Sequence, residues 1–280
     1  MTTTSIPSGP ASNWASSATL ALLGLAAAVV WIGGNLLFPW LAPTGIPSAG
    51  TRLAVVLAIL AGLWLGLRRT DFSSTKRTAV WLTVAIPLIL WLAFIWNFAA
   101  SGGFRPNPGA GRPPLLPIAI FLPLLVALPF LLWSRTFGTL LDVMPPSWLV
   151  GLQVFRLLGG IFLVNWYSGT VAGGFAWPAG VGDMATGIMA LPAALAVASG
   201  SASGRRTAFW WNIFGLTDFA VAITMGVLSS PGPLQKFGFD IPVSYAGTYP
   251  TVMIPAFAVP SWIMVHALSL RQLRRTRARV

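Results

Sequence analysis

The chain has 280 residues, of which 56% are hydrophobic and only 8% charged, and it carries a formal net charge of +12. A soluble domain usually has about 25% charged residues, so this composition excludes an ordinary water-soluble protein. The absence of cysteine excludes disulfides, iron–sulfur clusters and thiolate metal sites. With one histidine and no glutamate, we predict no metal centre and no cofactor within a single chain.

Eight long apolar segments follow one another, most of them near the 20 or so residues that a helix needs to cross a bilayer. In chain order they are 14–40, 51–67, 78–98, 114–133, 148–168, 178–199, 207–229 and 250–270. The second is the weakest, because it is short and has Arg52 at its start, so seven spans are the alternative to eight. Continuous apolar blocks differ from the alternating strands of a membrane barrel. The sequence therefore predicts an all-α, polytopic membrane helix bundle over residues 14–270.

The flanking segments and the basic residues predict the orientation. Residues 1–13 are rich in Thr, Ser and Pro and are predicted to form a disordered tail, while residues 271–280 form a basic tail. With eight spans, twelve of the 17 basic residues fall on the side of the two termini and four on the other side. By the positive-inside rule, both termini are predicted to lie in the cytoplasm, in a multi-pass protein of the cell (cytoplasmic) membrane.

The expected partners follow from the same charge distribution. The positive charge is interpreted as a topology signal, so no nucleic acid is expected as a partner. The lipid bilayer surrounds the bundle, and anionic lipid head groups are expected at the C-terminal tail. The sequence leaves open whether the chain forms a homo-oligomer.

Ionisable residues are distributed unevenly between the two halves of the predicted bundle. The spans within 14–133 have essentially none, whereas the spans within 148–270 have four: Arg156, Asp183, Asp218 and His266. Ionisable side chains are costly inside a membrane and are therefore candidates for function. The second half is predicted to hold the site.

The helical rise of about 1.5 Å per residue assigns the polar residues to three levels. From the outside inwards, the levels are Asp183 with Asn165 and Tyr167, then Asp218 with Arg156, then His266 with Gln153. Gln153, Arg156 and Tyr167 are expected to share one helix face because they follow steps of three and four residues. Asn212 lies at the level of His266 but off the helix face of Asp218, and it is given less weight.

Residues 180–183 read Gly-Val-Gly-Asp and match the GxGD pattern. This short stretch resembles the corresponding element of intramembrane aspartyl proteases, which would imply a site with two paired aspartates. In those proteases the partner aspartate precedes the motif, whereas Asp218 follows it here. The inverted order argues against a protease.

Buried Asp and His side chains at graded depth, with an Arg near the midplane, suit a path for protons or substrate. The leading hypothesis is therefore an integral membrane protein that acts as a proton-coupled permease for a small molecule or ion. One alternative is a membrane-embedded enzyme, or a subunit that binds haem, quinone or lipid, with His266 as ligand or proton donor. The other is a non-catalytic assembly or sensory subunit. The sequence does not decide whether the chain is an enzyme.

Overall fold

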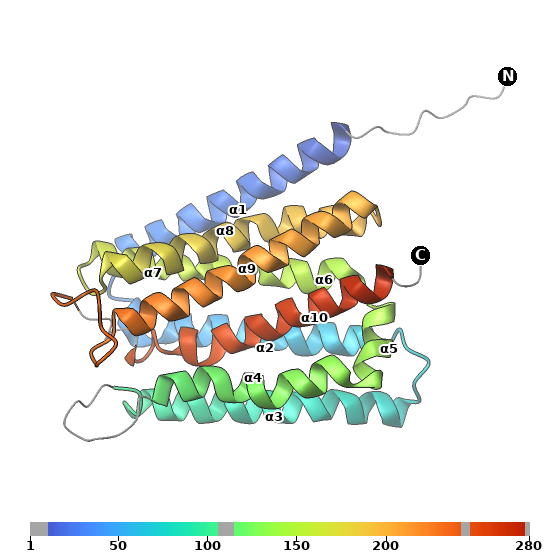
Figure 1. The fold of residues 1–280 in the computed structure, drawn as a ribbon, viewed down its shortest axis with the longest axis horizontal. Coiled ribbons are helices and arrows are strands. Elements are labelled where there is room, and N and C mark those ends of the chain that lie inside the picture. Colours follow the sequence, from blue (N-terminus) through green and yellow to red (C-terminus); the bar gives the residue numbers. More distant parts are fainter. Residues whose placement is uncertain (1–10, 106–114, 242–246, 278–280) are drawn as a thin grey trace.

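The computed structural model describes residues 11–105, 115–241 and 247–277, and all the regular elements within these ranges are helices (Figure 1). The α-helices are α1 (Ala11–Leu37), α2 (Ile46–Leu67), α3 (Ser74–Ala100), α4 (Leu115–Trp133), α5 (Arg135–Val143), α6 (Pro146–Gly151), α7 (Ile161–Tyr167), α8 (Gly173–Ala198), α9 (Ala202–Leu228) and α10 (Val259–Arg277). The 3₁₀-helices are η1 (Ala42–Thr44) and η2 (Leu152–Gly160), and η4 (Ile254–Ala258) is a π-helix.

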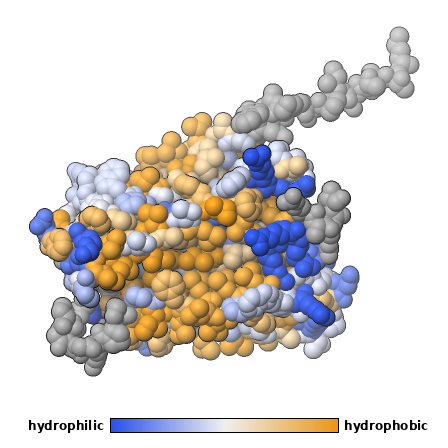
Figure 2. Space-filling model, in the orientation of Figure 1, coloured by the Kyte–Doolittle hydropathy of each residue, from blue (hydrophilic) through white to orange (hydrophobic). Residues whose placement is uncertain are grey.

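Eight segments of the described chain are long and apolar enough to cross a membrane. Six of them are single helices, the fifth is built from α6, η2 and α7, and the eighth from η4 and α10. The prediction of an all-helical bundle with eight apolar spans is confirmed at this level. In Figure 2 an apolar belt covers the middle of the visible face and hydrophilic residues gather at its two ends, which is compatible with an integral membrane protein.

The long helices run back and forth, so that the start of α1 and the end of α10 lie at the same end of the bundle (Figure 1). We call this the tail end; it also holds α5, which lies across the bundle, and the turns at 68–73 and 199–201. The opposite end, with the turns at 38–45 and 168–172, is called the loop end.

Serines begin three of the helices that start at the tail end. The Ser73, Ser134 and Ser201 hydroxyls accept hydrogen bonds from the backbone N–H groups of Lys76, Phe137 and Gly204. Each bond satisfies one of the N–H groups that the first turn of a helix leaves without a partner. These caps set where α3, α5 and α9 begin.

The second span begins five residues earlier than predicted. It covers Ile46–Leu67, with Pro47 in its first turn, where a missing N–H donor has no cost. The segment has 22 residues and is long enough to cross a membrane, so it is no longer the weak member of the eight. Arg52, expected at the start of the span, is therefore the seventh residue of α2 and lies inside it.

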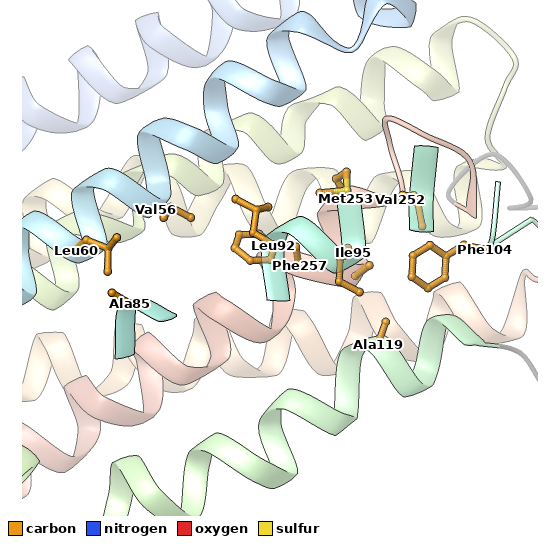
Figure 3. Close-up of a cluster of buried hydrophobic side chains, with 12 residues drawn as sticks. Val56, Leu60, Ala85, Leu92, Ile95, Phe104, Ala119, Val252, Met253 and Phe257 are labelled. Atoms are coloured by element: carbon orange, nitrogen blue, oxygen red, sulfur yellow. The ribbon is translucent and has the colours of Figure 1, made fainter. Parts of the chain in front are cut away.

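Mainly apolar contacts build the side of the bundle formed by α2, α3 and α4 (Figure 3), together with a hydrogen bond from Trp81 Nε1 to the Leu60 carbonyl. In this cluster Leu92 of α3 lies beside Phe257 of η4, and Ile95 of α3 lies close to Ala119 of α4. Packing of this kind holds η4 against α3 and α4. The buried ionisable side chains lie instead between η2, α8, α9 and α10.

The last turns of α10 are bound to α4 and α5. Arg271 donates hydrogen bonds to the carbonyls of Leu131 and Ser134, and Arg275 forms an ion pair with Asp142 at 2.6 Å. The basic segment after residue 270 thus begins as helix, and two of its arginines satisfy groups within the bundle.

Candidate functional site

Arg156, in the middle of η2, is the centre of a buried polar cluster. Its Nε donates a hydrogen bond of 2.8 Å to Oδ1 of Asp183 on α8, and its Nη2 donates to Oδ2 of Asp218 on α9. A third bond runs from Nη1 to the backbone carbonyl of Gly215 at 3.1 Å. The guanidinium also lies over the Phe219 ring, 3.7 Å from its centroid. One guanidinium therefore serves two carboxylates from two different helices.

His266 of α10 extends this cluster. Its Nε2 lies 3.1 Å from Arg156 Nη1 and its Nδ1 lies 2.9 Å from Oδ1 of Asn212. Arginine can only donate, so Nε2 is the acceptor and the ring proton is on Nδ1, which donates to Asn212. Asn212 in turn donates to Ser269 Oγ at 3.0 Å. The result is a continuous hydrogen-bonded chain from Arg156 through His266 and Asn212 to Ser269.

The formal charges of the cluster do not balance. With both carboxylates ionised and the imidazole neutral, one positive guanidinium faces two negative groups, which leaves a net charge of −1. A net charge in a buried site is unfavourable. The cluster is therefore suited to take up one proton or one small cation.

A cavity of about 90 Å³ lies beside the cluster. Arg156 and Asp183 border it in the interior, while Ala42, Pro47 and Pro250 border it near the loop end. Its walls come from α1, α2, η2, α7, α8, α9, η4 and α10. The cavity thus reaches from the loop end of the bundle to the charged groups at its centre.

Two irregular helical segments face this cavity. A 3₁₀-helix longer than three or four residues is uncommon, and η2 has nine. The π-helix η4, with Pro255 inside it, contributes Ile254 and Ala258 to the cavity wall. Both kinds of irregularity occur often at functional sites.

Arg52 of α2 also borders the cavity, although it was expected only at the very start of the second span. It is only 7% exposed, its Nε has no hydrogen-bond partner, and its Nη1 reaches only the neighbouring Thr51 Oγ1 at 3.5 Å. No carboxylate of the described residues forms an ion pair with it. The signal that would have found it is Pro47, which moves the start of α2 outward and carries Arg52 into the span.

A family model described as a domain of unknown function, DUF8737, matches residues 113–274, more than half of the chain. The chain belongs to this family. No curated protein matches the chain, and no solved structure does. The DUF8737 segment contains the whole polar cluster, whereas Arg52 and the walls from α1 and α2 lie before it.

Within the DUF8737 segment, the structure replaces the three predicted levels with one cluster. The expectation that Asp183 lies in an outer level, apart from Arg156, is wrong: Asp183 and Asp218 bind the same guanidinium. His266 contacts Arg156 directly. Asn212 of α9, which was given less weight, forms hydrogen bonds with both His266 and Ser269 of α10. The depth estimate failed because α8 begins at Gly173, five residues before its predicted start, so Asp183 lies deeper.

Tyr167 and Gln153 lie apart from the cluster. Tyr167, at the end of α7, is 75% exposed. Gln153 is fully buried, but the hydrogen bond from its Nε2 goes to the Trp262 carbonyl, at 3.2 Å. The shared face predicted for Gln153, Arg156 and Tyr167 assumed an α-helix; a 3₁₀-helix turns by about 120° per residue instead of 100°. The half of η2 that follows Arg156 therefore rotates Tyr167 away from Arg156.

The GxGD pattern of the DUF8737 segment has a packing explanation. A Cβ on Gly182 would overlap the carboxylate of Asp218, and one on Gly180 would lie 2.8 Å from Leu163 Cγ. The two glycines let α8 approach α9 and α7 closely enough for Asp183 and Asp218 to reach one arginine. Asp183 and Asp218 lie at one site, as the resemblance to aspartyl proteases implies, but both carboxylates are bound by the guanidinium of Arg156.

The substitution of Gly215 on α9 by alanine tests how tightly the cluster is packed. A Cβ there would lie 2.5 Å from His266 Nε2 and 3.0 Å from Arg156 Nη1, so Gly215→Ala is expected to displace both side chains. Overpacking of this kind costs about 1–3 kcal/mol. The matched control is Gly226→Ala on the same helix, where the new Cβ would make an ordinary 3.4 Å contact with Phe175. Thermal unfolding in detergent should separate the variants, and equal stability would contradict the packing.

Proposed function

We propose that the chain is a multi-pass protein of the cytoplasmic membrane that moves a small molecule or ion together with protons through the Arg156 cluster. Eight apolar helices and the apolar belt in Figure 2 support membrane insertion. The basic residues at the tail end support a cytoplasmic location for both termini.

The observation that carries this proposal is the position of the cluster between a cavity and a hydrogen-bonded chain. On the side of the loop end, Arg156 and Asp183 border the cavity. On the other side, His266, Asn212 and Ser269 continue the hydrogen bonds along α9 and α10 toward the tail end. Buried ionisable groups in such a series are typical of proton relays in transporters.

The interrupted helices give further support. Transporters commonly bind substrate and coupling ions where membrane helices are broken, because the irregular backbone there lines a cavity. In this chain η2 carries Arg156 itself, and η4 borders the same cavity. These two segments are the expected sites of movement when the cluster changes its protonation.

The arrangement around His266 favours a relay over a haem ligand. An iron ligand needs a ring nitrogen free to bind the metal, whereas Nε2 faces Arg156 and Nδ1 faces Asn212. Ligation would require breaking one of these contacts in a fully buried site.

The test uses the full chain reconstituted in liposomes with an entrapped pH dye. A panel of small solutes (carboxylates, amines, neutral amides and inorganic ions) is added outside, and the internal pH is followed. At least one solute should drive proton movement, and Asp218→Asn should reduce the rate at least tenfold. The variant should stay folded, because Arg156 and Asp183 then form a balanced pair.

The matched control is Asp142→Asn, which removes an acid that is paired with Arg275 at the tail end, away from the cavity. It should keep the wild-type rate. The proposal is wrong if no solute moves protons through the wild-type protein, or if Asp218→Asn moves them at the wild-type rate.

A further inference from the structure

The cavity is bordered by a buried guanidinium that forms no ion pair with the described residues. Arg156 has two carboxylates, but Arg52, on the same cavity, has none among the described residues. A buried guanidinium without an acid is unfavourable unless another anion binds it. Its planar fork of N–H donors matches a carboxylate, which it can bind through two parallel hydrogen bonds.

A second donor borders the same cavity. Asn165 of α7 is 7% exposed, and its Nδ2 has no hydrogen-bond partner, although the carbonyl of the same residue accepts from Ser168 and Thr170. An amide N–H₂ can only donate. Arg52 and Asn165 therefore both offer unused hydrogens to an acceptor in the cavity.

The size and walls of the cavity restrict the anion. A volume of about 90 Å³ corresponds to roughly six water-sized groups, at ~15 Å³ for each. Trp31, Phe155 and Trp262 supply aromatic walls. Inorganic phosphate has no apolar part to place against these rings, whereas a short carboxylic acid has both an anionic head and an apolar body.

We propose that this cavity binds a small monocarboxylate of about six non-hydrogen atoms, with Arg52 and Asn165 holding its carboxylate group and the aromatic residues its hydrocarbon part. The claim that a monocarboxylate binds here depends only on the cavity and the residues that line it. The further claim that this monocarboxylate is the transported molecule rests on the proposed function.

The proposal also explains the coupling to protons. A carboxylate in the cavity lies beside Asp183, which belongs to a cluster of net charge −1 when Asp183 and Asp218 are both ionised and His266 is neutral. Like charges repel at short range, so a bound anion favours the uptake of one proton by this carboxylate pair. By linkage, protonation of the pair favours binding of the anion to the same extent.

Isothermal titration calorimetry on the full chain in detergent tests the site. Butyrate, which has six non-hydrogen atoms, should bind, whereas butyramide, of equal size but uncharged, and inorganic phosphate should not. Arg52→Gln should weaken butyrate binding at least tenfold. Arg105→Gln, which changes an exposed arginine at the same end of the bundle, should leave it unchanged.

Two additional measurements cover the cases in which Arg52→Gln does not fold or the bound anion is a lipid head group. If Arg52→Gln does not fold, Arg52→Lys and Asn165→Ala should each weaken butyrate binding, because each removes only part of the donor set. Titration with a short-chain phosphatidic acid examines a lipid head group as the source of the anion. Binding of that lipid without binding of butyrate would overturn the proposal, as would equal binding of butyrate and butyramide.

Failure here is distinguishable from failure of the proposed function. If butyrate does not bind, but another solute drives proton movement that Asp218→Asn abolishes, then only the monocarboxylate assignment is wrong. If butyrate binds and Asp218→Asn moves protons like the wild type, then the site stands and the proton pathway is wrong.

Discussion

Replacement of Arg156 by leucine is expected to lower the free energy of unfolding by about 3–5 kcal/mol, the range measured when one partner of a buried ion pair is removed. The substitution leaves Asp183 and Asp218 facing each other in the interior without their guanidinium, and it removes the donor to Gly215 and His266. No other single change among the described residues breaks as many buried polar contacts. Equilibrium unfolding in mixed detergent micelles, followed by circular dichroism, measures the loss.

Arg206→Leu is the control for this measurement. Arg206 is an exposed arginine near the start of α9, so its removal should change stability by less than about 0.5 kcal/mol. A similar stability for Arg156→Leu and the wild type would mean that the cluster contributes little to folding.

The fold was largely predictable from the sequence because membrane helices are read from length and hydropathy alone. The eight apolar segments lie close to the predicted ones. The largest errors at helix starts, at α2, α8 and α9, arose where a proline in the first turn, a run of small residues or a serine cap let the helix begin earlier. Such starts depend on local capping, which apolar length does not reveal.

The members of the site were partly predictable, but their arrangement was not. Arg156, Asp183, Asp218 and His266 stood out because each is an ionisable residue in an apolar segment. Their convergence on one guanidinium depends on the nine-residue 3₁₀-helix η2 and on the close approach of α8 to α9 at Gly182. Neither follows from a periodicity of 3.6 residues. The donor Arg52 was missed because a span boundary was misplaced.

The second large effect is expected when the three charged residues are neutralised together. In the variant Arg156→Met, Asp183→Asn, Asp218→Asn, no charge of the cluster is left without a partner. Replacement of a buried ionic group by neutral residues of similar volume is often neutral or stabilising. The triple variant should therefore recover most of the roughly 3–5 kcal/mol lost in Arg156→Leu, in the same unfolding assay.

Activity should respond in the opposite way, and this contrast separates a structural role of the cluster from a functional one. The neutral variant has no group at this position that exchanges a proton, so solute-driven proton movement in liposomes should fall to the level of protein-free vesicles. An ion triad that only holds α8 and α9 against η2 would leave transport close to normal once stability is restored. A stable but inactive triple variant is thus the outcome that the proposed pathway requires, while a stable and active one would assign the cluster to packing.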